Sequence, residues 1–440
     1  MRIAMVSLQF EETATGGGGV HVKHICDEFL RSGQEMTLVS IHTDKTLRKD
    51  TKLIPGEAPY SVEERLDGLT LIRFLIDRDI AQPYAGKKDA ELRRIRRFAD
   101  AALRWLGGHI HEFDVINLHG HHLIPGYMAR ELEDAGPKIV STIHALETTY
   151  VTGGEFVGAY EGTKEVLAEI REWEAMARYA DVVVVNSPMV KDEFKRIIEE
   201  HDRDAEKYND KTVVISSGCD EHFLMSDDEV KEKLAGRPDV IDLVTFCRLD
   251  PSKGVEFSIG GAKEAAKLSS HRFRLTIAGI PSSKEYIRKV RKEAAGLPSN
   301  LEVRFMLLDA ISPAEEKKEI LDDKRIYILP TLKEPFGMSV IEASARGDMI
   351  VSADTNGPRF MFESGGSGRT DWGVITDYGV LADITDDHRG HFTANIGKAV
   401  NWTVDNWQRA AENVLRFNGK IRKTWTWQSI ARQYLELFSE

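Results

Sequence analysis

The sequence has few cysteines and no long hydrophobic stretch, and each absence excludes a class of protein. Three cysteines in 440 residues, Cys26, Cys219 and Cys247, are too few and too scattered for a disulfide framework or a structural zinc site. Reduced thiols are the ordinary state of cysteine in the cytoplasm, so a cytoplasmic location is expected. No apolar run approaches the ~18 residues that a membrane span requires.

An excess of basic charge is also lacking. The chain has 59 lysines and arginines against 71 aspartates and glutamates, which gives a formal net charge of −12 at pH 7. General nucleic-acid binding requires a clustered positive surface, so no nucleic-acid partner is expected. A local basic pocket for one phosphate group is still compatible with this charge.

What the chain does have is length and a regular alternation of strand and helix patterns. One hydrophobic core rarely grows beyond ~250–300 residues, so a length of 440 residues predicts at least two domains. The expected strands are 3–8, 36–40, 69–75, 113–118, 138–143, 182–186, 212–216, 241–247, 273–278, 301–305, 325–329 and 349–352. The clearest expected helices are 20–32, 90–106, 160–179, 283–295 and 392–417.

This alternation predicts an α/β fold with two Rossmann-like domains, each built on a parallel sheet covered by helices on both faces. The apolar run 1–8 is interpreted as the first strand and not as a signal peptide, because polar and acidic residues follow it directly. The segment 216–240 is polar and broken, so the hinge is placed there. The expected domains are 1–222, with a returning helix at about 424–440, and 223–423. Ligands of such sheets bind at the carboxyl ends of the strands, so the two sheets are expected to face each other across a ligand-binding cleft.

A glycine-rich segment, Gly16 to Gly19, follows the first predicted strand by a few residues. Glycines let the backbone approach a ligand closely, and the helix that follows offers its N-terminus to an anion. The spacing differs from the dinucleotide fingerprint, which opens directly after the strand. Taken alone, the segment fits a flexible loop equally well.

Two cations follow the predicted strand 241–247. Arg248 lies at the strand end, and Lys253 lies at the start of the next helix. Two cations beside a helix N-terminus form a plausible clamp for a diphosphate. Most arginines and lysines are solvated surface charges, but the position at the carboxyl end of a strand favours the clamp.

A third motif, residues 334–347, follows the strand 325–329. Pro335 and Gly337 predict a tight entry into a helix over 338–346, which Gly347 ends. Glu334 lies before this helix and Glu342 lies within it, so both carboxylates can accept hydrogen bonds from the hydroxyls of one ligand.

Together these motifs resemble the glycosyltransferases of family 4, the group 1 glycosyl transferases, which have the two-domain GT-B fold. The resemblance covers nearly the whole chain. It includes Phe113-Asp114-Val115-Ile116 followed by His119, Thr142-Ile143-His144, and Ser217-Gly218-Cys219-Asp220, where the family usually has Asn-Gly-Val-Asp. The resemblance implies a metal-independent enzyme that moves a hexosyl group from a nucleotide diphosphate sugar to an acceptor hydroxyl with retention of configuration, and it implies no cofactor.

The resemblance also implies roles for the matching residues. Arg248 and Lys253 would neutralise the diphosphate, Glu334 would contact the donor sugar, and His144 would lie by its 6-hydroxyl. Further donor contacts are implied at Gly17, Gly18, Gly337, Met338, Ser339 and Glu342, of which Glu342 would hold the ribose. The acceptor would bind the first domain, with His119 and Tyr150 as candidate contacts.

The sequence departs from the family pattern at several places. Cys247 replaces the glycine that usually precedes Arg-Leu, and Gly347-Asp348-Met349 replaces Gly-Leu-Pro. The turn that begins at Asn356 lacks the family's glutamate. None of these changes removes a proposed charged contact, but they weaken any transfer of donor-base or subfamily detail.

The sequence patterns that could indicate a metal site or a membrane-binding helix are less specific than the glycosyltransferase motifs. Asp77-Arg78-Asp79 and Asp202-Arg203-Asp204 match the bare D-x-D pattern, and 119–122 carries three histidines, but such groups arise by chance and no metal is expected. The amphipathic segment 87–106 has a basic face. Such a helix can lie on a membrane surface, but a domain helix with a solvated face is the favoured interpretation.

The acceptor stays open at this stage. A small soluble sugar, sugar phosphate or sugar acid is favoured over a cell-surface polysaccharide or glycolipid, because no dominant basic apolar surface is evident. A nucleotide-sugar epimerase and a catalytically silent nucleotide-sugar-binding subunit share the fold and are the alternatives. Membrane association is compatible but not favoured, and a homodimer is compatible with the sequence.

Overall fold

The computed structural model describes residues 1–14, 16–65, 67–78, 80, 88–120, 123–147, 151–152, 155–156, 164–202, 205–208, 210–308, 314–363, 367–384 and 389–440. Contacts between Cα atoms divide the chain into two compact units. Unit 1 comprises Met1–Ser217 and Trp427–Glu440, and unit 2 comprises Gly218–Thr426. The chain therefore passes from one unit to the other twice, once on each side of unit 2.

Unit 1 is built on an eight-stranded sheet with the order β10-β9-β6-β5-β1-β2-β4-β3. Its strands are β1 (Arg2–Val6), β2 (Glu35–Ile41), β3 (Tyr60–Glu64), β4 (Leu69–Phe74), β5 (Val115–Gly120), β6 (Lys138–Ile143), β9 (Val182–Val185) and β10 (Thr212–Val214). All pair in parallel except β3, which runs antiparallel to β4 at the edge. A separate short hairpin joins β7 (Val151–Thr152) and β8 (Glu155–Phe156).

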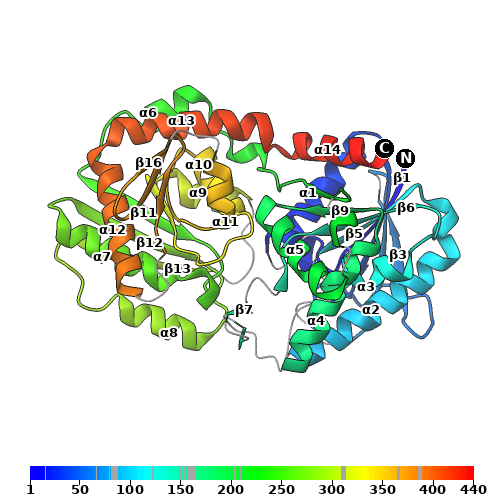
Figure 1. Ribbon diagram of the computed structural model, residues 1–440. Helices are drawn as coiled ribbons and strands as arrows, with labels where there is room; N and C mark the ends of the chain where they lie inside the picture. Colours follow the sequence, from blue (N-terminus) through cyan, green and yellow to red (C-terminus); the bar gives the residue numbers. More distant parts are fainter. Residues whose placement is uncertain are drawn as a thin grey trace. The chain divides into compact units, whose positions relative to one another are not determined.

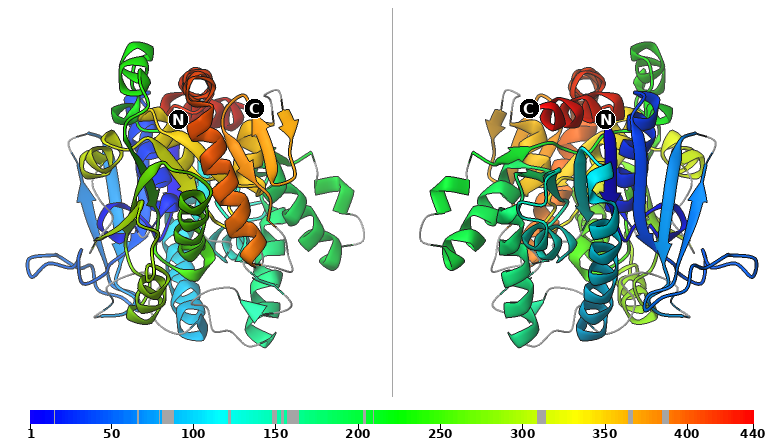
Figure 2. Two further views of the ribbon diagram at one scale, coloured as in Figure 1. Left: turned by 90° about the vertical axis from the view of Figure 1, so that its left-hand side faces the viewer. Right: turned by 90° about the vertical axis from the view of Figure 1, so that its right-hand side faces the viewer.

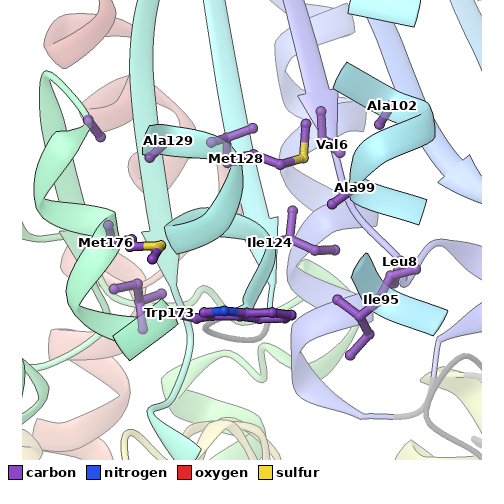
Figure 3. Packing of buried hydrophobic residues seen from close by; sticks show 14 of the residues in the cluster. Val6, Leu8, Ile95, Ala99, Ala102, Ile124, Met128, Ala129, Trp173 and Met176 are labelled. Atoms are coloured by element: carbon purple, nitrogen blue, oxygen red, sulfur yellow. The ribbon is translucent and has the colours of Figure 1, made fainter. Parts of the chain in front are cut away.

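Helices cover this sheet. They are α1 (Gly17–Arg31), α2 (Lys88–His109), α3 (Leu123–Glu131), α4 (Lys164–Met176), α5 (Pro188–His201) and α14 (Trp427–Ser439), with short 3-10 turns η1 (Glu11–Thr13), η2 (Ile110–Glu112), η4 (Ala177–Tyr179) and η5 (Ala205–Tyr208). The C-terminal helix α14 packs beside α1 (Figure 1). Figure 3 shows part of the core of unit 1, in which Ile124 of α3 lies near Trp173 of α4 and Met128 of α3 lies near Val6 of β1.

Two helices of this core, α3 and α4, pack closely against each other at Gly126. A Cβ atom at Gly126 in α3 would lie 1.7 Å from the carbonyl oxygen of Trp173 in α4, so only glycine lets the two helices come this near. Helix α5 begins at Pro188. Ser187 caps it by accepting a hydrogen bond from the Val190 amide, and Pro188 is a favourable residue for the first turn.

Unit 2 has a second eight-stranded sheet with the order β13-β12-β11-β14-β15-β18-β17-β16. Its strands are β11 (Val240–Phe246), β12 (Arg272–Gly279), β13 (Leu301–Leu307), β14 (Ile326–Leu329), β15 (Met349–Ala353), β16 (Ser367–Arg369), β17 (Gly373–Thr376) and β18 (Val380–Ala382). The first six strands in this order pair in parallel, and β17 is antiparallel to both of its neighbours.

The helices of unit 2 are α6 (Asp227–Leu234), α7 (Val255–Leu268), α8 (Lys284–Glu293), α9 (Ala314–Asp322), α10 (Met338–Ala345), α11 (Asn356–Phe362), α12 (Arg389–Asp405) and α13 (Trp407–Thr424), with 3-10 turns η6 (Glu221–Phe223) and η7 (Pro251–Lys253). Helix α12 packs along α7 (Figure 2). A Cβ at Gly261 would lie 2.3 Å from Ile396 Cγ2, so glycine permits this close packing.

All the expected strands are present, and the α/β class is confirmed. Three expectations need correction. The single helix expected over 392–417 is two helices, α12 and α13, separated at Asn406. The sheets are not wholly parallel, because the edge strand β3 and the strand β17, which lies between β16 and β18, run antiparallel to their neighbours. The polar segment 216–240 is not a linker throughout: it contains η6 and α6, and α6 begins with a capping box between Ser226 and Glu229.

The amphipathic segment 87–106 corresponds to α2. Its apolar side, Leu92, Ile95, Ala99, Ala102 and Leu106, lies in the core of unit 1. The exposed arginines of α2 have partners, such as Arg97 with Asp77 at 2.8 Å. The fold therefore accounts for the amphipathic pattern. Among the helices that the structure describes, none has the length and apolar character needed to cross a membrane.

Candidate active site

In unit 2, the strand order reverses between β11 and β14, which are parallel neighbours. The loops that leave such a point diverge on either side of the sheet and open a crevice at the carboxyl ends of the strands. Arg248 and Lys253 follow β11, and Glu334 and Gly337 follow β14. The topology thus brings together four residues that the sequence separates into two motifs.

An ion pair joins the two loops. Lys253 Nζ donates a hydrogen bond to Glu334 Oε2 at 2.7 Å, and the two side chains are only 17% and 12% exposed. The backbone holds Lys253 in place, because Gly254 takes a left-handed conformation with φ of +59°. A Cβ at Gly254 would lie 2.8 Å from the carbonyl oxygen of Pro330, just after β14.

Arg248 is held by Asp250. Arg248 Nε donates to Asp250 Oδ2, and the arginine side chain is 45% exposed. Asp250 also accepts from the Ser252 amide at 2.9 Å and so caps η7. Burial raises the pKa of the Asp250 carboxyl, but Arg248, Ser252 and Lys253 together outweigh burial and leave the pKa lowered. The ionised Asp250 therefore orients both the loop and the guanidinium.

The start of α10 supplies backbone donors. Gly337 precedes the helix with φ of +104°, and Met338 and Ser339 form its first turn, where the amide groups have no partner within the helix. Close packing explains the position of Gly357 in α11, since a Cβ there would lie 1.9 Å from Phe336 O. The helix N-terminus and its partial positive charge are therefore fixed in space.

Glu342 lies further along α10 and is 5% exposed. Lys317 Nζ of α9 donates to Glu342 Oε2. The two glutamates of the motif therefore belong to separate ion pairs, Glu334 with Lys253 and Glu342 with Lys317. Lys317 was not identified from the sequence, because a lysine on a helix rich in charged residues does not differ from an ordinary surface lysine.

In unit 1, the strand order reverses between β1 and β5. Gly17 and Gly18 open α1 after β1, and Gly18 lies against the side chain of His144, since a Cβ there would lie 3.5 Å from His144 Cδ2. The Gly19 amide donates to Gln9 Oε1 at 3.1 Å, which fixes the glycine-rich turn. The structure thus brings together Gly18, His144 and Gln9.

Histidines cluster behind this turn. His119 Nδ1 lies 3.4 Å from His144 Nε2, and the His21 ring centroid lies 4.6 Å from that of His144. His21 Nδ1 lies 3.1 Å from Ser217 Oγ, and its Nε2 lies 3.4 Å from the hydroxyl of Tyr434 in α14. His21, Ser217 and Tyr434 were not identified from sequence. Of these three residues, only His21 could have been linked to the glycine-rich segment from the sequence, because it lies about one helical turn after Gly17.

Burial controls the protonation of this cluster. Burial lowers the pKa of His21 well below 6.5, and the neighbouring His144, His119 and His24 lower it further. Burial likewise lowers the pKa of His119, with His144 adding to the effect. Both rings are neutral near pH 7. His119 is fully buried, and its Nε2 has no hydrogen-bond partner within the described part of the protein.

Several predicted positions lie outside the described residues: Tyr150, Asp79, Arg203, and the pair His121 and His122. Asp77 is engaged by Arg94 Nε at 2.8 Å as well as by Arg97. Over the residues that the structure describes, no group of three or more histidine, cysteine, aspartate or glutamate side chains could hold a metal ion.

The fold and this arrangement define a class of protein, the two-domain glycosyltransferases. The family model described as Glycosyltransferase Family 4 matches residues 15–221, and the model described as Glycosyl transferases group 1 matches residues 226–370. The chain belongs to the family 4, group 1 glycosyltransferases and has the GT-B fold. It is therefore a glycosyltransferase.

The relatives of this chain share little sequence identity with it, but the matches extend over most of both chains. The D-inositol 3-phosphate glycosyltransferase of Corynebacterium diphtheriae is 25% identical over 81% of this chain and 79% of the relative. The alpha-maltose-1-phosphate synthase of Mycobacterium tuberculosis is 23% identical over 100% of this chain and 99% of the relative.

Solved structures support the fold. The sucrose-phosphate synthase from Thermosynechococcus elongatus superposes with a TM-score of 0.70 at 16% identity, covering 100% of this chain and 98% of the other. The Anabaena protein Alr3699/HepE in complex with UDP and glucose superposes with a TM-score of 0.64 at 15% identity, covering 100% of this chain and 99% of the other.

Proposed function

We propose that this glycosyltransferase moves a hexosyl group from a UDP-, GDP- or ADP-sugar to a hydroxyl of a small acceptor, with retention of configuration and without a metal ion. The observation that carries the proposal is the buried Lys253–Glu334 pair at the strand-order reversal of unit 2, beside Arg248 and the N-terminus of α10. Cations and a helix N-terminus together are suited to a diphosphate, and a carboxylate beside them is suited to sugar hydroxyls.

A sugar phosphate is the acceptor class we favour. The inositol-phosphate and maltose-phosphate enzymes named above align with most or all of this chain, and both carry a phosphorylated sugar or polyol in their names. In this proposal, unit 2 binds the nucleotide sugar and unit 1 supplies the acceptor contacts, with His119 and Tyr150 among them. Gly17 and Gly18 approach the diphosphate, and His144 lies by the 6-hydroxyl of the donor sugar.

The proposed reaction depends on stabilising the negative charge of the leaving diphosphate. The bond between the anomeric carbon and the diphosphate oxygen breaks, and negative charge develops on the leaving diphosphate. Arg248, Lys253 and the first amides of α10 (Gly337, Met338 and Ser339) stabilise that charge in a fixed geometry. These groups supply the positive potential that a metal ion provides in other transferases.

The acceptor oxygen then bonds to the anomeric carbon on the face from which the diphosphate leaves. The acceptor proton passes to an oxygen of the departing phosphate, so atoms and charge balance without a protein nucleophile. Glu334 holds the donor sugar, and Glu342 holds the ribose hydroxyls. An inverted product anomer or a trapped glycosyl-enzyme would contradict this route.

The test is a donor screen in the presence of EDTA. The protein is incubated with UDP-, GDP- and ADP-sugars, first alone and then with hexose phosphates and inositol 3-phosphate, and release of the nucleoside diphosphate is measured. We expect one donor to be consumed, faster with a phosphorylated acceptor, and the product anomer to match the donor. Activity that requires added metal would overturn metal independence.

The alternatives give different results in the same screen. Conversion of the donor sugar to its epimer without an acceptor would indicate an epimerase. Binding of nucleoside diphosphates without any turnover, over the whole acceptor panel, would favour a silent binding subunit. No binding of any nucleoside diphosphate would overturn the assignment of the diphosphate clamp.

A further inference from the structure

Lys317 has an environment unlike that of a surface lysine. Its ammonium donates to Glu342 Oε2, and it lies 5.7 Å from the centroid of the Phe223 ring and 5.4 Å from that of Phe246. The Lys317 side chain is 22% exposed and that of Glu342 is 7% exposed. A cation with two aromatic rings and a buried carboxylate around it is held by several interactions at once.

The neighbouring lysine on the same helix shows the contrast. Lys318 pairs with Asp322 at 3.6 Å, and these side chains are 40% and 36% exposed. Such an exposed pair contributes little, because solvent and salt screen it. Glu342 is buried, so loss of its partner would leave a carboxylate without compensation in a poorly solvated place. Lys317 is therefore held beside the buried carboxylate of Glu342, whereas Lys318 forms an exposed pair on the surface of the same helix.

The nearby Cys219 thiol does not supply charge to this pair. Burial raises the pKa of Cys219 well above its usual range, Glu342 raises it further, and Lys317 only partly offsets both. The thiol is protonated near pH 7. The carboxylate of Glu342 thus has the ammonium of Lys317 as its partner on Oε2.

We propose that Lys317 is a specificity-determining residue of the nucleotide site, which forms with Glu342 a donor–acceptor pair for the two ribose hydroxyls and so selects ribonucleotides over 2′-deoxyribonucleotides. The inference rests on the proposed function, in which Glu342 holds the ribose. Each ribose hydroxyl both donates and accepts a hydrogen bond. A carboxylate alone only accepts, whereas the ammonium adds further N–H donors beside it.

The experiment measures the affinity of UDP, ADP and GDP and of their 2′-deoxy forms by titration calorimetry. The variants are Lys317→Met, Lys317→Arg and the matched control Lys318→Met, with folding checked by circular dichroism. We expect the unmodified protein to bind its preferred ribonucleotide about tenfold more tightly than the deoxy form, since a hydrogen bond to a charged group contributes on that order.

Lys317→Met should weaken ribonucleotide binding about tenfold and bring the ratio of the two affinities near one. Lys317→Arg keeps a cation and donors and should retain most of that ratio, and Lys318→Met should change nothing.

Two results separate this inference from the proposed function. If the unmodified protein binds no nucleoside diphosphate, the proposed function fails, and the inference with it. If it binds ribonucleotide and deoxyribonucleotide equally, or if Lys317→Met keeps the original ratio, the role of Lys317 is overturned while the proposed function stands. If Lys317→Met fails to fold, equal affinities of the unmodified protein for the two forms still overturn the role of Lys317, and so does a lost ratio in a folded Lys317→Arg that keeps the cation.

Discussion

Lys253 Nζ lies 2.7 Å from Glu334 Oε2, although 81 residues separate the two in the chain. The pair joins the loop after β11 to the loop after β14, the two loops that diverge at the strand-order reversal of unit 2. Because both side chains are mostly buried, each fixes the position of the other. A ligand that enters this place meets a cation and a carboxylate whose positions are already set.

The two cations of the clamp give the first prediction. Lys253→Ala and Arg248→Ala should each lower kcat by about 10²–10³-fold, because each removes a positive group from the place where the proposed function puts the leaving diphosphate. Steady-state kinetics with the preferred donor measure this loss. Lys267→Ala is the control, since Lys267 pairs with Glu264 at the same distance of 2.7 Å but is 58% exposed. An unchanged kcat in either clamp variant would contradict the assignment.

The two glutamates of the motif should behave differently. Glu334→Ala is expected to lower turnover more than nucleotide affinity, because Glu334 lies with Lys253 where the donor sugar is proposed to bind. Glu342→Ala is expected to weaken nucleotide binding by about tenfold, as for a hydrogen bond to a charged group. Calorimetry with the nucleoside diphosphate and kinetics with the intact donor separate the two effects. Equal losses of nucleotide affinity would argue against this division.

The buried histidines predict sensitivity to acid. Burial lowers the pKa of His21 and His119 in the fold, whereas the unfolded chain takes up protons on these rings below about pH 6.5. The stabilisation is therefore fully present above pH 6.5 and is lost as the pH falls. Each ring should add a slope of up to about 1.4 kcal/mol per pH unit below that value.

Chemical unfolding at several pH values between 5 and 8 tests this. His119→Gln should reduce the slope of unfolding free energy against pH, and His111→Gln is the control because His111 is exposed. A slope that is the same in His119→Gln as in the unmodified protein would show that His119 is not held neutral by the fold.

A buried ion pair in unit 2 gives a prediction about stability. Lys233 Nζ lies 2.8 Å from Asp348 Oδ1, and the two side chains are 7% and 0% exposed. Lys233→Met should cost about 3–5 kcal/mol, because it leaves the carboxylate buried without its partner. The double variant Lys233→Met, Asp348→Leu should recover much of that loss. Urea unfolding of unit 2 measures both, and a single variant within about 1 kcal/mol of the parent would refute the argument.

Much of the fold could be predicted from local patterns. Continuous apolar runs such as 182–185 indicated strands buried on both faces, and the Pro335–Gly337 turn with Gly347 marked α10 almost to the residue. The strands β16 to β18 on one side of the second sheet were missed, because they are short and carry no long apolar run. The break between α12 and α13 at Asn406 was missed because the helical periodicity continues across it.

The sequence by itself determined the α/β class and the two Rossmann-like sheets, because strand periodicity is a local property of the chain. Its loop motifs also singled out Arg248, Lys253, Glu334 and Glu342 as candidate site residues. Only the tertiary structure decided which of these charges meet. It paired Glu334 with Lys253 and Glu342 with Lys317, and it gathered His21, His119 and His144 from three separate segments. Strand order sets these contacts, and strand order depends on the packing of whole elements, which no local pattern encodes.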